Sequence, residues 1–269
     1  MRDADRVHSA LQGVDAVVHL AAIVGDPACA RDPELAKAVN LEASLGLFAE
    51  AQEAGARRFL FASTCSNYGR MADTSVLATE EHELRPVSLY AETKVAVERT
   101  LLAAPARPTA ATVLRLATLY GLSPRMRFDL TVNEFVMQML VHRKLVVFGE
   151  QFWRPYVHVR DAARAFAMVL ASPAGAVAGR VFNVGDTQEN YRKSDLLERM
   201  EVRIPGAEIQ RVKKAEDPRD YRVSFARIHE RLGFSVTRRV PDGIDEIATA
   251  LESGLIEDPH HPAHYNVQS

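Results

Sequence analysis

The stretch DAVVHLAA, residues 15–22, decides the fold of this chain. Apart from one Asp and one His it is a continuous apolar run, of the kind that a parallel strand buried on both faces requires. Similar runs follow at 58–63 (RFLFAS) and 112–116 (TVLRL). The segments 33–55 and 88–102 between them have helical periodicity. Strands and helices alternating at this spacing predict an α/β fold with βαβ units on a parallel sheet.

The regular alternation loosens after Gly121. Further strands are expected at 145–148, 156–159 and 181–184, and helices at 129–142, 161–170, 194–200 and 242–252. The final residues, DPHHPAHYNVQS at 258–269, contain turn formers and no apolar period, so we expect a tail. Its three histidines, His260, His261 and His264, have no Cys or acidic ligand set beside them. We therefore predict an exposed cluster and no metal site.

Composition limits the possible functions. The 269 residues carry a net charge of −2 with both signs interspersed, so no nucleic-acid partner is expected. Two cysteines make no disulfide framework. No apolar run reaches membrane-spanning length, and the N-terminus lacks the apolar core of a signal peptide. These features predict a soluble, cytoplasmic protein with no membrane partner.

The segment SLYAETKVAVE, residues 88–98, carries the chemistry. Tyr90 and Lys94 lie four residues apart, which places both side chains on one helical face. A nearby ammonium favours the phenolate and lowers the pKa of a phenol, so Tyr90 can serve as a general acid or base. The alternative is an exposed Tyr and Lys that merely share a helix face, because motifs this short often occur by chance.

The context of this segment resembles a known family. HLAA (19–22), FASTCSNYG (61–69), YAETK (90–94), LRLATLYG (114–121), RPYVHVRDAARA (154–165), FNVG (182–185) and RLGF (231–234) occur in this order. Together they resemble the NAD-dependent epimerase/dehydratase branch of the extended short-chain dehydrogenase/reductase superfamily, which acts on nucleotide sugars. The resemblance covers nearly the whole chain, and the ordered set is specific although each motif alone is weak.

The resemblance implies two domains. Residues 1–121 would form an incomplete Rossmann-like NAD(P)-binding domain to which 157–185 return, and residues 122–269 would mainly form a smaller substrate-binding domain. A homodimer through the helices that carry Asn40 and Tyr90 is implied as well.

By the same resemblance, Thr64, Tyr90 and Lys94 take the places of the catalytic Ser/Thr, Tyr and Lys. Thr64 would hydrogen-bond the substrate oxygen that changes oxidation state, and Tyr90 would move its proton. Lys94 would lower the pKa of Tyr90 and bind the nicotinamide ribose. For Thr64 the alternative is a strand-end hydroxyl that caps a turn.

The implied cofactor is NAD, with NADP not excluded, and the implied substrate is a nucleotide-diphosphate sugar. Besides Tyr90 and Lys94, the residues expected at the cofactor are Ala21, Ala22 and Asn40, whereas His19 would be structural. Those expected at the substrate are Asn133, Arg154 and Arg219, since guanidinium groups suit paired phosphate oxygens. The alternatives are a solvent-facing Asn40 and surface ion pairs for the two arginines.

Three departures from the family pattern bear on function. No glycine-rich turn follows an N-terminal strand, so we expect the chain to lack roughly the first sixty residues of the pattern, the length of two βα units. Cys65 and Ser66 replace the Asp-Glu pair of the sugar dehydratases, and Thr118 replaces an Asn frequent in epimerases. We therefore expect an epimerase or a related sugar reductase; the alternative is a truncated, noncatalytic binding or regulatory subunit.

Overall fold

The computed structural model describes residues 1–104, 109–215 and 219–266. Their strands are β1 (Ala16–His19), β2 (Arg58–Thr64), β3 (Ala110–Leu116), β4 (Thr118–Tyr120), β5 (Lys144–Phe148), β6 (Trp153–His158), β7 (Arg180–Val184), β8 (Asn190–Arg192) and β9 (Glu208–Val212). The α-helices are α1 (Ala4–Leu11), α2 (Asp26–Arg31), α3 (Pro33–Lys37), α4 (Ala43–Glu53), α5 (Leu89–Ala103), α6 (Thr131–Met137), α7 (Val159–Ala171), α8 (Ala174–Val177), α9 (Lys193–Arg203), α10 (Ala226–Leu232) and α11 (Val240–Glu252).

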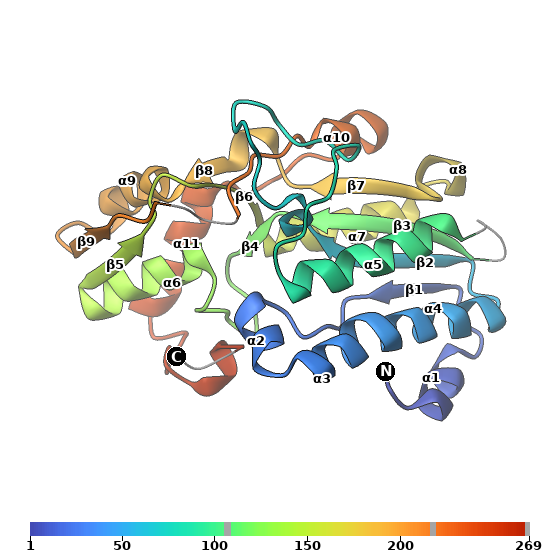
Figure 1. The fold of residues 1–269 in the computed structure, drawn as a ribbon. Coiled ribbons are helices and arrows are strands. Elements are labelled where there is room, and N and C mark those ends of the chain that lie inside the picture. Colours follow the sequence, from blue (N-terminus) through green and yellow to red (C-terminus); the bar gives the residue numbers. More distant parts are fainter. Residues whose placement is uncertain (105–108, 216–218, 267–269) are drawn as a thin grey trace.

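The main sheet has four parallel strands in the order β1-β2-β3-β7 (Figure 1). Phe61 on β2 pairs with His19 on β1 and with Val113 on β3, so the predicted apolar runs lie side by side. This confirms the predicted α/β fold with a Rossmann-like parallel sheet. Because all four strands run in one direction, their carboxyl ends meet at one edge, where ligands bind in open α/β sheets.

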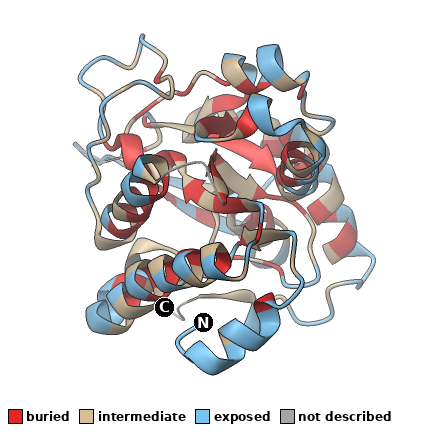
Figure 2. Ribbon diagram, turned by 90° about the vertical axis from the view of Figure 1, so that its right-hand side faces the viewer, coloured by how far each residue is buried: buried red, intermediate tan, exposed pale blue. Residues whose placement is uncertain are grey.

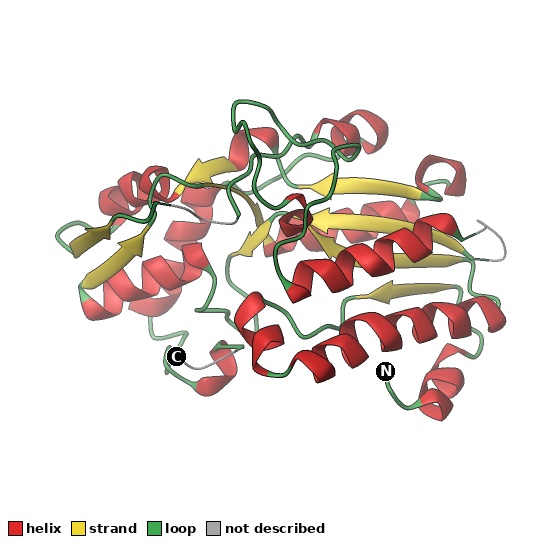
Figure 3. Cartoon of the chain, viewed as in Figure 1, coloured by secondary structure: helices red, strands yellow, loops and turns green. Residues whose placement is uncertain are grey.

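Helices cover both faces of this sheet (Figure 3). On one face, Phe59, Phe61 and Val113 pack with Phe48 of α4 and Leu101 of α5. On the other face, a second core gathers buried side chains from the strands, from α7 and from α10: Leu60, Leu114, Phe182, Ala165, Val169 and Ile228. Figure 2 shows the strands largely buried and the outer sides of the helices exposed. Burial on both faces explains why the strands read as continuous apolar runs.

The later part of the chain builds two smaller sheets, β4-β6-β8 and β5-β9. They pack with α6, α9 and α11 around a third core that includes Phe135, Leu196 and Ile247. This part stands beside the carboxyl end of the main sheet (Figure 1). The domain boundary expected after residue 121 stays a prediction. Within the described residues, no helix is both long and apolar enough to cross a bilayer.

The C-terminal segment is not the tail that the sequence predicted. Residues Pro262–His264 form a 3-10 turn, and Phe128 N–H donates to the His264 carbonyl at 3.0 Å. Arg125 donates to the carbonyls of Ala263 and Tyr265 at 2.7 and 3.2 Å. These long-range backbone contacts fix a segment that has no apolar period of its own. Among the residues described, no group of three or more His, Cys, Asp or Glu is arranged to hold a metal ion.

His19 at the end of β1 predicts a pH dependence of stability. It is 3% exposed, contacts the Phe59 and Phe61 rings and lies 2.8 Å from Ser44 Oγ. Burial, and then the charge of Lys94, lower its pKa to about 4. The folded protein therefore binds fewer protons than the unfolded chain between about pH 6.5 and 4. Stability from this group is complete above pH 6.5 and falls as the pH drops, by on the order of 2–3 kcal/mol.

Urea unfolding at pH 7 and pH 4.5 measures this loss. The matched control is His19→Asn, which cannot titrate in this range and should lose less stability between the two pH values. An equal loss in both proteins would contradict the assignment.

Candidate functional site

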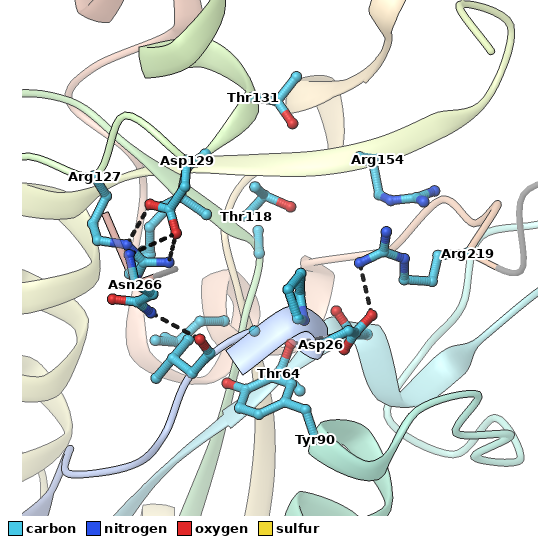
Figure 4. A pocket seen from close by; sticks show the side chains of 18 of the residues that line it. Asp26, Thr64, Tyr90, Thr118, Arg127, Asp129, Thr131, Arg154, Arg219 and Asn266 are labelled. Carbon is cyan, nitrogen blue, oxygen red and sulfur yellow. Dashed lines mark hydrogen bonds and ion pairs between the residues drawn. The ribbon is translucent and has the colours of Figure 1, made fainter. Parts of the chain in front are cut away.

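A cavity of about 530 Å³ lies at the carboxyl end of the main sheet. Its lining comes from β2, β3, β4 and β6, from the first turns of α2, α5, α6 and α9, and from loops: Val24–Ala28, Ser63, Thr64, Ser66, Tyr90, Leu116–Leu119, Arg127, Asp129–Thr131, Arg154, Lys193, Arg219, Tyr221 and Asn266. Figure 4 shows Arg154 and Arg219 close together on one side, Arg127, Asp129 and Asn266 on the other, and Thr64 and Tyr90 below them. The lining includes four cationic and two carboxylate side chains, so an anionic ligand suits it.

Local structure places Thr64 and Tyr90 at this cavity. Thr64 is the last residue of β2, and its Oγ1 accepts a hydrogen bond from Ser66 N–H at 3.1 Å. Tyr90 is the second residue of α5, whose N-cap Ser88 accepts from Ala91 N–H at 3.3 Å. A Ser at the N-cap satisfies one of the free donors that begin a helix. Both hydroxyl-bearing side chains therefore reach the same cavity, Thr64 from the end of β2 and Tyr90 from the start of α5.

Lys94 lies beneath Tyr90 in the buried interior and is 3% exposed. Its Nζ donates to the Ala62 carbonyl at 2.9 Å and stands 4.6 Å from the centre of the Phe61 ring and 5.9 Å from that of Tyr90. Burial lowers the pKa of this ammonium to about 8. It does not itself line the cavity.

The predicted lowering of the Tyr90 pKa is not found in the structure. Burial raises the pKa of the phenol above its usual range, and the nearby Cys29 and Asp26 act in the same direction. Arg127 opposes them. The cost of desolvating a phenolate outweighs the favourable charges here, so Tyr90 is a protonated phenol at neutral pH.

A buried polar network supports these residues from below. Arg115 on β3 pairs with Glu98 on α5 through Nη2–Oε2 and Nε–Oε2 distances of 2.7 and 3.1 Å. Ser63, beside Thr64, donates to Glu98, and Asn67 donates to both Ser63 and Glu98 at 3.1 and 2.8 Å. Glu98 follows Lys94 by one helical turn. The network thus joins α5 to β2 and β3 directly under the cavity.

The two predicted phosphate-binding arginines do meet at the cavity. The Arg154 guanidinium lies 5.3 Å from the centre of the Tyr221 ring and donates to the Trp153 carbonyl at 2.7 Å. Arg219 Nη1 is 3.0 Å from Asp26 Oδ2. They come from positions 65 residues apart in the chain, and the fold brings their guanidinium groups to one side of the cavity (Figure 4).

The remaining predicted residues lie outside the described lining. Asn133 is buried on α6 and accepts a hydrogen bond from Gly121 N–H at 3.0 Å. Asn40 is buried in the π-helical turn Ala38–Glu42 and binds both backbone groups of Ile23, at 2.8 and 2.9 Å. It therefore braces the loop after β1 and is not solvent-facing. Ala21 and Ala22, in that loop, are exposed and half-buried.

Several lining residues were not singled out from the sequence. Arg127 grips Asp129 through two bonds of 2.6 and 2.8 Å. Asn266 donates to the Val24 carbonyl at 2.8 Å and accepts from Arg125 at 2.9 Å, which closes one side of the cavity. The Arg-x-Asp spacing and the Asp-Pro start of α2 were available as signals for Arg127 and Asp26. No local pattern marks Asn266.

Similarity to known proteins shows which family this chain belongs to. The profile of the NAD dependent epimerase/dehydratase family matches residues 1–185. "Uncharacterized UDP-glucose epimerase YtcB" of Bacillus subtilis is 30% identical over 183 residues, which is 67% of this chain and 56% of that relative. The match thus spans little more than half the length of that protein. GDP-6-deoxy-D-mannose reductase of Pseudomonas aeruginosa is 27% identical over 266 residues, 91% of this chain and 82% of the relative.

The fold is also similar to that of a solved structure. MoeE5 in complex with UDP-glucuronic acid and NAD has a TM-score of 0.79 and 25% identity over 93% of this chain and 84% of its own. The family profile matches well over half of the chain, and the site lies at the sheet edge where that fold binds ligands. This chain belongs to the NAD dependent epimerase/dehydratase family.

Proposed function

We propose that this chain catalyses the NAD(P)-dependent epimerisation of a nucleotide-diphosphate sugar. The observation that carries the proposal is that Thr64 and Tyr90 line the same cavity of about 530 Å³ as Arg154 and Arg219. This volume lies within the usual range for small-molecule sites, about 300–1,000 Å³. The names of the relatives, a UDP-glucose epimerase and a GDP-sugar reductase, support the substrate class.

Each residue has a distinct role in the proposed reaction. Arg154 and Arg219 bind the diphosphate through charge-assisted hydrogen bonds, which sets the sugar over Tyr90 and Thr64. In its ionised form, the Tyr90 oxygen takes the proton of the reacting sugar hydroxyl and becomes a neutral phenol, while the hydrogen on the same carbon leaves as hydride to the nicotinamide and a carbonyl forms. Thr64 donates a hydrogen bond to that oxygen. Return of hydride to the opposite face, and of the proton from Tyr90, gives the epimer with no net oxidation.

The residues at the reacting end fit a nicotinamide cofactor. When bound, the nicotinamide accepts the hydride from the sugar carbon and returns it. Lys94 has three donors, and among the described residues it makes one side-chain hydrogen bond, to Ala62. The proposal assigns the remaining donors to the hydroxyl pair of a ribose, which would have to reach this ammonium from beside the cavity because Lys94 is 3% exposed and outside the lining. A contact between the Lys94 ammonium and the ribose hydroxyls would keep this charge beside Tyr90 and favour the phenolate form of Tyr90.

A sugar reductase is the second candidate. The similarity to the GDP-6-deoxy-D-mannose reductase extends over 91% of this chain, farther than that to YtcB. In that reaction hydride is delivered to a keto sugar, Tyr90 supplies the proton to the new hydroxyl, and the cofactor is consumed as a substrate. Both candidates use the same residues.

The homodimer remains a prediction. The helices that carry Asn40 and Tyr90 pack side by side on one face of the main sheet (Figure 1).

The test is to incubate the purified chain with NAD or NADP and a panel of UDP- and GDP-sugars, and to follow sugar products by chromatography. Epimer formation without net cofactor reduction supports the first proposal. Net oxidation of NADH or NADPH with a keto sugar supports the second. Binding of nucleotide sugars without any conversion would contradict both and favour a noncatalytic binding subunit.

Arg154→Ala should raise the Michaelis constant by about tenfold or more and lower turnover much less. A charged hydrogen bond to phosphate is worth roughly 1.5–3 kcal/mol, and it is made equally in the ground and transition states. Steady-state kinetics measure the split. Arg160→Ala is the control, because that half-exposed arginine pairs with Glu246 on the surface. A loss confined to turnover would contradict a role in gripping substrate.

A further inference from the structure

Asp26 occupies an unexpected position in the cavity. It lines the space beside Arg219, and its Oδ2 lies 3.0 Å from Arg219 Nη1. The other carboxylate of the lining, Asp129, is on the opposite side and is held by Arg127 at 2.6 and 2.8 Å. Among the described lining residues, Asp26 is therefore the carboxylate that lies on the same side of the cavity as Arg154 and Arg219.

The second oxygen of Asp26 contacts the helix that carries Tyr90. Ser88 Oγ donates to Asp26 Oδ1 at 2.7 Å, and the same Oγ accepts from Ala91 N–H at the start of α5. One carboxylate thus links a cation of the cavity to the N-cap two residues before Tyr90. The side chains of Asp26 and Arg219 are 31% and 41% exposed, so the ion pair is accessible and modest in strength.

We propose that Asp26 competes with the substrate diphosphate for Arg219: it holds Arg219 in the cavity and releases it to the diphosphate when a nucleotide sugar binds. The inference rests on the proposed function, because it takes Arg219 as a phosphate ligand. Carboxylate and phosphate oxygens both suit a guanidinium. A diphosphate beside Arg154 and Arg219 would also lie close to the negative charge of Asp26 and compete with it. Asp26 is in this sense a positioning residue.

The exchange predicts that removal of the charge tightens binding. Asp26→Asn keeps an oxygen that accepts from Ser88 and removes the anion that competes for Arg219. We expect the dissociation constants of UDP and GDP, measured by titration calorimetry at fixed ionic strength, to fall by about three- to fivefold, the scale of a partly exposed ion pair. Asp26→Ser is a second, smaller neutral variant for which the same direction is expected. Glu34→Gln, an equal change of net charge on α3, should leave binding unchanged.

A double-mutant cycle separates release of Arg219 from simple repulsion. Arg219→Met should weaken binding of both nucleotides, and Asp26→Asn in that background should change it by less than about 1.5-fold. An equal tightening in both backgrounds would show general repulsion and overturn the exchange. Unchanged or weaker binding in Asp26→Asn and Asp26→Ser would overturn it as well. If Arg219→Met leaves binding unchanged, the assignment of Arg219 to the diphosphate fails, and that outcome contradicts the substrate site of the proposed function instead.

Discussion

Tyr90→Phe should lower turnover of the nucleotide sugar by about 100-fold or more, the usual contribution of a positioned general acid or base. The substitution removes only the phenolic oxygen and leaves the ring at the cavity wall. The Michaelis constant should change much less, because Arg154 and Arg219 would hold the diphosphate on another side of the cavity. Steady-state kinetics with the active sugar found in the substrate panel give both values.

The matched control is Tyr221→Phe. Tyr221 lines the same cavity and its hydroxyl lies 3.4 Å from Ser66 Oγ, and the ring that stacks with Arg154 is kept in Phe. We expect a much smaller loss for this variant. Near-normal turnover in Tyr90→Phe, or an equal loss in both variants, would end the assignment of Tyr90 as the proton-transferring group.

Glu98→Gln should destabilise the fold by about 3–5 kcal/mol. It leaves the Arg115 guanidinium, 3% exposed, without its counter-ion in the interior, and breaking one partner of a buried ion pair has this cost. Equilibrium urea unfolding measures the change. Replacing both partners, as in Glu98→Gln with Arg115→Met, should recover part of the loss because no buried charge is then left unpaired.

Glu92→Gln provides the comparison on the same helix. Glu92 is exposed, and a surface substitution of this kind usually changes stability by less than about 0.5 kcal/mol. If Glu98→Gln unfolded at the same urea concentration as Glu92→Gln, the buried network would not be a source of stability.

The parallel sheet could be predicted from local signals in the sequence, whereas the roles given to residues at its edge remain predictions. The runs at 15–22, 58–63 and 112–116 are buried strands because both of their faces need apolar cover. The Tyr90–Lys94 spacing places two residues on one helix whatever surrounds it. Local signals did not place the Asn133 side chain. The residue lies in the first turn of a helix, as predicted, but its side chain accepts a hydrogen bond from Gly121 N–H and does not line the cavity.

Tertiary structure alone decided which distant residues meet and how their charges behave. Asn266 reaches Val24 across 242 positions, and Arg219 reaches Asp26, because packing of the C-terminal segment and loops brings them together. Periodicity extends only over neighbouring residues and cannot specify such contacts. The Tyr90 pKa shows the same limit: the sequence indicated a cation nearby, whereas the sign of the shift follows from desolvation by the whole surroundings. Helices and strands could therefore be predicted from neighbouring residues, whereas the pKa values and charge contacts of the site depend on the completed fold.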